Sequence, residues 1–321
     1  MKKFLCNFIF LCFILLLVSS IIEIALLYKT NTYSYKHQYV ESHLDEIKVL
    51  IMGNSHTLYA LIPDSMTKKA FNTAISGRNI FYDVELVKKY LPRMNHLETV
   101  VVPLDYFNFY LGREIQNPKY FRFEKDMNST QKCMYYKYMG IPAESVWFWS
   151  ELLNSKLKFM SRFWESAAAA RECDSLGSQR LRLSGRKAGW ELVKLPKLID
   201  KSINPNQEKL KQLNDLYNEL CSVSNQKDVR LLLVSTPMYK TYQKDMDSCV
   251  VNEMHEFAYS LCQKYPNTEY YDFSYDDHFV KDDFNDASHL LESGAIKFTH
   301  IINDIIQDKY GCNIDNTNDI I

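Results

Sequence analysis

The segment KVLIMGNSHT, residues 48–57, decides the fold of this 321-residue chain. Residues 48–52 form a short apolar run, which is typical of a buried strand. The run ends at Gly53, and a turn leads from there to Ser55. A hydroxyl directly after a central strand lies at the edge where open α/β sheets bind their ligands. The segment therefore predicts a strand, a turn and a helix that together present a serine at this edge.

A second motif, DASH at residues 286–289, lies near the other end of the chain. Serine is a weak nucleophile and needs an adjacent base and a group that orients that base. His289 and Asp286 supply one of each, and a spacing of three residues lets the carboxylate meet the imidazole in a turn or a first helical turn. The two motifs predict a site of Ser55 as nucleophile, His289 as base and Asp286 as orienting acid.

Each of these positions has a competing interpretation. Ser55 could be only a helix N-cap, and His289 could be an exposed loop histidine. His278 is a second candidate base, whereas His56 is a poor one, because side chains of adjacent residues diverge; it could line the pocket. The other acids of the segment that compete with Asp286 are Asp276, Asp277, Asp282 and Asp283.

Apolar runs and helical periodicity alternate along the rest of the chain. Four further runs predict strands, and apolar residues at helical spacing follow or precede each of them. Five strands that alternate with helices favour a five-stranded parallel sheet in a three-layer α/β/α fold with right-handed crossovers. The four further strands are predicted at residues 70–75, 99–104, 229–234 and 268–273.

The alternation lapses between residues 111 and 203, where aromatic residues gather. This composition predicts a mostly helical insertion with one flexible loop, in the Gly/Ser/Arg-rich stretch of residues 175–189. The aromatic side chains of the insertion either form their own core or act as a lid that stacks on sugar rings. The insertion divides the catalytic core into residues 47–110 and 204–312. Residues 29–46 are predicted to be a stalk and residues 313–321 a tail.

The N-terminus carries Lys2 and Lys3, followed by an apolar run over residues 4–28. About 25 such residues are enough to span a hydrocarbon core of roughly 30 Å. The lysines place the N-terminus in the cytoplasm and the rest of the chain outside. A cleaved signal peptide and a buried core helix are the alternatives, but the run continues past Ser19 and Ser20 without a small-residue cleavage site. We expect a single-pass transmembrane anchor over residues 1–28.

Composition argues against several other functions. The formal net charge is −1, with 24% charged residues, so no polybasic surface favours nucleic acid. The turn at residues 53–55 lacks the lysine of a phosphate-binding loop and the further glycines of a dinucleotide fingerprint. No Cys/His cluster has zinc spacing, so we expect neither cofactor nor metal. The spacing of the eight cysteines leaves disulfide pairing open.

The first motif, GNSHT, and the last, Asp-x-x-His-Leu before a helix, resemble the first and last blocks of the SGNH (GDSL-like) hydrolases. The resemblance covers about residues 48–110 and 229–310, and is closer to membrane-anchored members such as the D-alanyl transfer protein of teichoic acid pathways and the alginate O-acetylation proteins. It implies a flavodoxin-like fold and a Ser-His-Asp triad. It also implies oxyanion donors at the backbone N–H groups of Ser55 and Gly77, although Gly77 could serve only a tight turn.

The chain departs from this family after the third strand. The family's Gly-x-Asn-Asp block is replaced by PLDYFN, residues 103–108, in which Asn108 stands at the wrong offset to donate to an oxyanion. The departure fits the membrane-anchored branch better than the free lipases and esterases.

The resemblance implies a membrane-anchored serine esterase or O-acyltransferase that acts on cell-envelope or exported carbohydrate, with acetyl as the expected acyl group. Its expected location is the bacterial cytoplasmic membrane, with the catalytic domain outside and a membrane-bound O-acyltransferase as a candidate partner. The alternative is a non-catalytic scaffold or carbohydrate-binding component of a surface-polysaccharide complex. The altered third block and Glu23 within the apolar run lend weight to that alternative.

Overall fold

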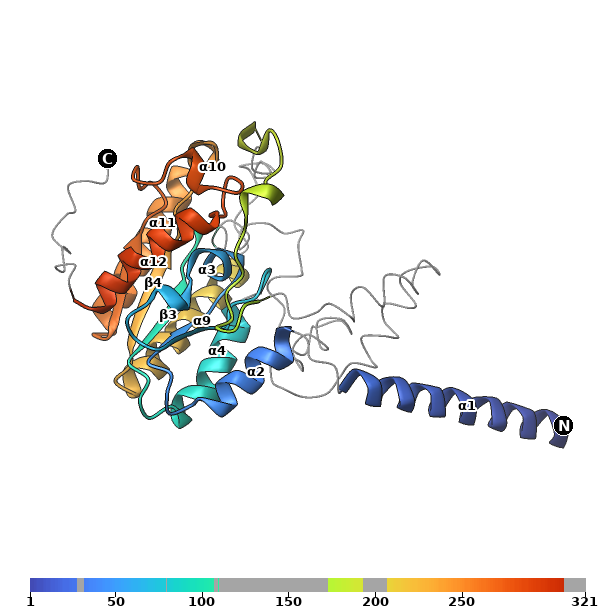
Figure 1. The fold of residues 1–321 in the computed structure, drawn as a ribbon. Helices are drawn as coiled ribbons and strands as arrows, with labels where there is room; N and C mark the ends of the chain where they lie inside the picture. Colours follow the sequence, from blue (N-terminus) through green and yellow to red (C-terminus); the bar gives the residue numbers. More distant parts are fainter. Residues whose placement is uncertain (28–31, 79, 107–108, 110–172, 193–206, 309–321) are drawn as a thin grey trace. The chain divides into compact units, whose positions relative to one another are not determined.

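The computed structural model describes residues 1–27, 32–78, 80–106, 109, 173–192 and 207–308 (Figure 1). The chain divides into two compact units. One comprises residues 1–41 and 122–172, and the other comprises residues 42–121 and 173–321. In the first unit, the described residues form helix α1 (Lys2–Leu27) and almost all of helix α2 (Thr32–Ser42).

Helix α1 exposes its large apolar side chains, from Phe4 at 75% to Val18 at 43% of full exposure. No helix in the described part of the chain is both long enough and apolar enough to cross a membrane. The structure therefore does not support the membrane span expected over residues 4–28.

The second unit contains a five-stranded parallel sheet in the order β2-β1-β3-β4-β5. The predicted α/β fold and all five predicted strands are confirmed, with some strands one to three residues shorter than expected. The strands are β1 (Val49–Ile51), β2 (Ala70–Asn72), β3 (Thr99–Pro103), β4 (Arg230–Ser235) and β5 (Thr268–Asp272).

Strand β1 lies between the two strands that follow it in the chain, because Val49 pairs with Ala70 of β2 on one side and with Thr99 of β3 on the other. The chain therefore runs from β1 to one neighbour and then crosses over to the opposite side. Such a reversal is a switch point, where the loops after the strands separate and leave a crevice at their carboxyl ends. Ser55 follows β1 and Asp105 follows β3, so both residues lie at this point.

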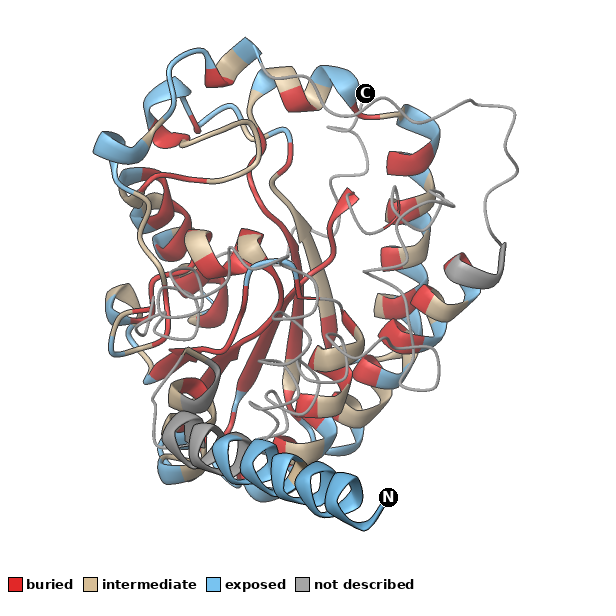
Figure 2. Ribbon diagram, turned by 90° about the vertical axis from the view of Figure 1, so that its right-hand side faces the viewer, coloured by how far each residue is buried: buried red, intermediate tan, exposed pale blue. Residues whose placement is uncertain are grey.

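Helices cover both faces of the sheet, which explains why its strands are apolar on both sides (Figure 2). Ile51 and Leu232 face the layer formed by α3 (Ser55–Ala60) and α12 (Glu292–Ile306), where they share a core with Phe298. Alternate strand residues point to the opposite face. The helices of that second layer are α4 (Ile80–Tyr90), α9 (Gln207–Gln226) and α11 (Ser248–Lys264).

Residues 173–192 are the described part of the predicted insertion. The first of them lie at the edge of β2, and later ones hydrogen-bond to Leu58 of α3 and Glu292 of α12. The N–H of Asn72 donates to the carbonyl of Leu176 at 2.9 Å, and a Cβ at Gly177 would overlap the Asn72 carbonyl. Arg180 then forms ion pairs with Asp64 and Glu292. Only two short 3₁₀ turns, η4 (Leu183–Gly185) and η5 (Trp190–Leu192), occur in this stretch. This irregular backbone agrees with the loop predicted over residues 175–189, and the part of the insertion predicted to be helical lies outside the described residues.

The turn after β1 depends on the absence of a side chain at Gly53. Gly53 has a φ of +116°, and a Cβ there would overlap the ring of Pro103 and lie 2.7 Å from Thr57 Oγ1. Residues with a Cβ rarely adopt this φ. The turn therefore requires glycine for its backbone conformation and for its close packing on β3.

We expect Gly53→Ala to lower the free energy of unfolding by about 3 kcal/mol, from backbone strain and overpacking together. Thermal unfolding should show a fall in Tm of roughly 6–12 °C. Gly185→Ala is the matched control, since a Cβ there meets nothing within 4 Å; it should change stability by less than about 0.5 kcal/mol. Equal effects of the two substitutions would contradict this account.

Candidate functional site

Ser55 is the first residue of α3, and the preceding residue caps this helix. The side-chain oxygen of Asn54 accepts a hydrogen bond from the backbone N–H of His56 at 2.8 Å. Asn54 therefore satisfies one of the free N–H groups at the helix start. The interpretation of Ser55 as only an N-cap is wrong, and its partly buried hydroxyl is left for another interaction.

Two further hydrogen bonds hold the turn that carries Ser55. The N–H of Gly53 donates to Asp83 Oδ1 at 2.9 Å, and Thr57 Oγ1 donates to the Met52 carbonyl at 2.7 Å. Asp83 is buried and paired with Arg78. Because the turn is tied to α4 through Asp83 as well as to β1 through Thr57, the position of Ser55 is fixed from two sides.

The loop with Asp286 and His289 is closed by an isolated antiparallel bridge between Phe284 and Leu290. Within this loop, Asp286 Oδ1 accepts the backbone N–H groups of Ser288 and His289, each at 3.0 Å. The same carboxylate lies 2.9 Å from His289 Nδ1 through both of its oxygens. One carboxylate therefore shapes the loop and orients the imidazole.

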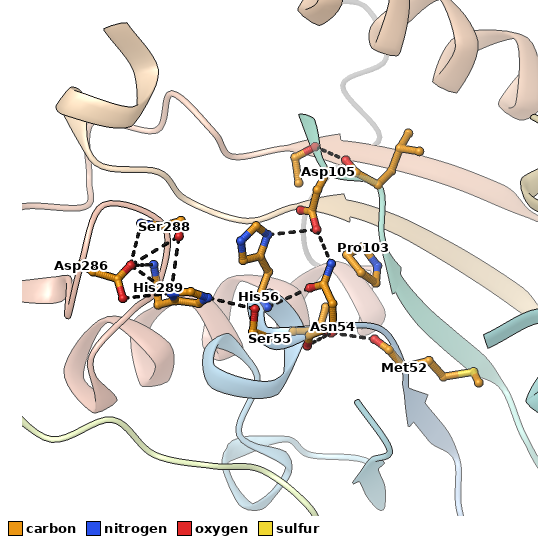
Figure 3. Close-up of polar contacts among 12 residues, drawn as sticks. Met52, Asn54, Ser55, His56, Pro103, Asp105, Asp286, Ser288 and His289 are labelled. Carbon is orange, nitrogen blue, oxygen red and sulfur yellow. Dashed lines mark hydrogen bonds and ion pairs between the residues drawn. The ribbon is translucent and has the colours of Figure 1, made fainter. Parts of the chain in front are cut away.

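The imidazole of His289 joins this loop to α3. Its Nε2 lies 2.9 Å from Ser55 Oγ, although the two residues are 234 positions apart in the chain (Figure 3). With Nδ1 directed at Asp286, the tautomer that fits these contacts carries its hydrogen on Nδ1 and accepts the serine proton at Nε2. The structure thus brings Ser55, His289 and Asp286 together in one hydrogen-bonded chain, the arrangement in which an imidazole can deprotonate a serine.

The charge of Asp286 suits this arrangement. Burial by itself raises the pKa of this carboxyl, but the hydrogen bond and charge of His289, together with the N–H of Ser288, outweigh burial and lower the pKa to about 2. Asp286 is therefore an anion at neutral pH. An anion at this position can stabilise the imidazolium that forms when His289 takes up a proton.

Two aromatic rings of α3 pack against the imidazole of His289. The ring centroid of His56 lies 5.3 Å from that of His289, and the centroid of Tyr59 lies 5.2 Å from it, both in edge-to-face geometry. Tyr59 is four residues after Ser55 and so lies on the same helix face. A single short helix therefore presents the nucleophile and both rings that contact the base.

His56 is itself paired with a second acid, Asp105. His56 Nδ1 is 2.9 Å from Asp105 Oδ2, and Asn54 Nδ2 donates to the same oxygen at 3.0 Å. Asp105 is fully buried and His56 is nearly so. The sequence assigned no role to Asp105 and treated His56 only as a residue that could line the pocket. The sequence did hold one signal for Asp105, because this acid directly follows the strand predicted over residues 99–104.

The competing candidates of the 276–289 segment make other contacts. Asp283 accepts a hydrogen bond from Lys297 Nζ at 2.6 Å, and Asp276 lies 2.7 Å from His278 Nδ1. The His278 side chain is 88% exposed. Asp277 and Asp282 are exposed as well. Geometry therefore favours Asp286 over the other acids and His289 over His278.

The two expected oxyanion donors are the backbone N–H groups of Ser55 and Gly77. Gly77 lies in an exposed turn with a φ of +71°, which is the conformation that a tight turn needs. The polar contacts described for Ser55, Asp286 and His289 do not include Gly77. The N–H of Ser55 begins α3 and so has no acceptor within that helix. Both donor roles remain predictions, and Asn108 lies outside the described residues.

Within the described ranges, no group of three or more histidine, cysteine, aspartate or glutamate side chains could hold a metal ion. The cysteines of these ranges are free thiols. Burial raises the pKa of Cys221 to about 12 and that of Cys262 to about 11, so both thiols stay protonated at neutral pH.

Comparison with known proteins finds a distant structural similarity. No family model and no curated protein matches the chain. Among solved structures, the chain is similar to one from Streptococcus pneumonia described as "a putative platelet activating factor", with 13% identity and a TM-score of 0.43. The match covers 90% of this chain and 98% of the other. At this score the likeness carries no conclusion about function.

The ionisation of Asp286 should make the free energy of unfolding depend on pH in the acid range. The folded pKa of about 2 lies below the ordinary value of 3.8. The contribution of Asp286 to the free energy of unfolding is therefore present above about pH 4 and is lost as pH falls through 2. The side chain is 40% exposed, so solvent screening reduces the contribution to about 1 kcal/mol.

We therefore expect the difference in unfolding free energy between wild type and Asp286→Asn to shrink by roughly 0.6 kcal/mol between pH 5 and pH 2.5, because part of the contribution persists until the pH falls below 2. Urea denaturation at several pH values measures it. Asp282→Asn, at an exposed acid of the same segment, is the control and should differ little from wild type at any pH. A difference for Asp286→Asn that does not change with pH would rule out this ionic contribution.

Proposed function

We propose that the chain is a serine esterase or O-acyltransferase of the SGNH (GDSL-like) type. The observation that carries the proposal is the 2.9 Å contact of His289 Nε2 with Ser55 Oγ, in a histidine whose other nitrogen faces Asp286. Further support comes from the place of Ser55, at the switch point of a parallel sheet where such folds bind ligands. The resemblance of the two motifs to the first and last blocks of the family agrees with this arrangement.

In the proposed reaction, Ser55 Oγ attacks the carbonyl carbon of an ester while His289 Nε2 takes the hydroxyl proton. Asp286 stabilises the resulting imidazolium through Nδ1. The carbonyl electron pair moves to its oxygen, for which the N–H groups of Ser55 and Gly77 are the proposed donors. When the tetrahedral intermediate collapses, the alcohol leaves with the proton from His289, and the acyl group remains on Ser55.

The second half of the reaction uses the same residues. Water or a sugar hydroxyl gives its proton to His289 and attacks the acyl carbon, after which Ser55 recovers the proton. Water as acceptor makes the protein an esterase, and a sugar hydroxyl makes it an O-acyltransferase. His289 serves both halves as base and then as acid, so the site needs no second base near Ser55.

Ser55→Ala and His289→Ala should each lower kcat on an acetyl ester by at least about 1,000-fold, and the double variant should be little worse than either, because triad members act as a unit. A fluorophosphonate should label Ser55 in wild type and leave Ser55→Ala unlabelled. His278→Ala is the matched control, because that histidine is exposed and bonded to Asp276, and it should retain wild-type activity. Full activity of Ser55→Ala would refute the triad.

The proposed substrate is an acetyl ester of a cell-envelope or exported carbohydrate. This part of the proposal rests on the sequence: the family resemblance, and Lys2 and Lys3 before the apolar residues 4–28, from which we also propose a membrane-anchored protein with its catalytic domain outside the cytoplasm. A membrane-bound O-acyltransferase is the proposed partner in the transfer reaction, since it could deliver an acyl group to Ser55.

Purified full-length protein separates hydrolysis from transfer when it is given an acetyl ester with and without a polysaccharide acceptor. We expect release of acetate in both cases, because water can reach a partly buried Ser55. Acetyl groups found on the polysaccharide, with faster consumption of the ester, would assign transfer instead. If the ester is not consumed and Ser55 is not labelled, the protein is a scaffold or binding component and the enzymatic proposal is wrong.

A further inference from the structure

Beside the proposed base lies a second pair of histidine and carboxylate that the triad chemistry does not use. His56 follows Ser55 directly, and its ring lies between Asp105 and His289 (Figure 3). The carboxylate of Asp105 comes from the end of β3 and the imidazole from α3, so the pair bridges the switch point. A buried carboxylate and imidazole in such contact are costly to desolvate, so a structural role alone is a poor reason to hold them beside an active serine.

The position of His56 is fixed from three directions. Asp105 lies 2.9 Å from its Nδ1, Asn54 accepts its backbone N–H, and the ring of His289 packs edge-to-face against it. Asn54 also donates to Asp105, so one amide ties both members of the pair together. The imidazole is therefore held in one orientation before any substrate binds.

The charges around the pair favour a protonated His56. Burial by itself lowers the pKa of His56, but the charge and proximity of Asp105, and the more distant charge of Asp286, overcome burial and raise the pKa. Beyond Asp105 lies Tyr270 of β5, whose hydroxyl bonds Ser235 at 2.8 Å. The next acid, Asp272, is bonded to His255 of α11 at 2.6 Å and is thus already paired.

We propose that His56 takes part in the reaction as an imidazolium held by Asp105, and that its positive charge stabilises the oxyanion formed when Ser55 attacks an ester carbonyl. This inference rests on the function proposed above. In that step the Ser55 Oγ–carbon bond forms, the carbonyl electron pair moves to oxygen, and His289 receives the serine proton. His56 keeps its own proton throughout.

The geometry suits this role because both members of the ion pair are buried and the positive end is the one nearer the serine. Asp105, the negative end, is fully buried at the end of β3, whereas the ring of His56 lies on the side of Ser55 and His289. A fixed dipole whose positive end faces the reacting serine favours negative charge there, and its effect is large where water is excluded. The pair also compensates for the absence of an amide donor at the expected offset after β3.

The test is the pH dependence of kcat/KM on an acetyl ester. The wild type should give a bell-shaped profile, because His289 must be free of its extra proton and His56 must keep its own. The alkaline limb then marks loss of the His56 proton. His56→Gln should lower kcat about 100-fold, the order of magnitude for one oxyanion-stabilising group, with little change in KM, and should remove the alkaline limb.

Asp105→Asn provides a second variant in case His56→Gln does not fold. It should move the alkaline limb to lower pH, because His56 loses its counter-ion. His278→Gln is the control and should reproduce the wild-type profile. An alkaline limb that persists in His56→Gln with kcat within about threefold of wild type, or one that does not move in Asp105→Asn, would overturn the inference.

Labelling distinguishes failure of this inference from failure of the proposed function. Fluorophosphonate should label Ser55 in His56→Gln, only more slowly than in wild type. If wild type reacts with the probe and hydrolyses ester but His56→Gln is unaffected, only the role of His56 is wrong. If wild type neither hydrolyses ester nor takes up the probe, the proposed function fails, and the inference fails with it.

Discussion

The close packing of Gly53 on Pro103 is the constraint on which the site depends. β1 and β3 are hydrogen-bonded neighbours, so the turn after β1 must pass the end of β3 with no room for a side chain. That turn directs Ser55 into the crevice and begins α3. It also brings Asn54 and His56 within reach of Asp105, the second residue after β3. One backbone approach thus positions the serine and the buried pair beside it.

The opposite side of the site depends on how α12 packs against α3. Thr299 of α12 accepts a hydrogen bond from the N–H of Ile62, just beyond α3, at 2.9 Å, and donates to Ala295 at 2.7 Å. The loop that carries His289 leads directly into α12. Because the same helix contacts the end of α3, the base and the nucleophile are positioned by one packed unit, even though nearly the whole length of the domain separates them in sequence.

The sequence predicted those features that depend on local patterns. Apolar runs identified all five strands, and the Asp-x-x-His spacing identified a loop in which Asp286 does contact His289. Features that arise from contacts between distant segments were missed. The position of Asp105 after a predicted strand could have marked it as a possible site residue, but its contact with His56 follows from strand order, which the sequence did not show. The composition of residues 175–189 indicated a loop but not its path, because the hydrogen bonds that fix the path join the loop to distant segments.

The contact of Leu176 and Gly177 with β2 affects whether the sheet can pair with another protein molecule. β2 is one of the two edge strands of this sheet, and a bare strand edge can pair with a strand of another protein molecule. Here the carbonyl of Leu176 accepts a hydrogen bond from the Asn72 N–H. Gly177 lies so close to the Asn72 carbonyl that no side chain fits between them. The segment therefore protects this margin of the sheet from intermolecular pairing and aggregation.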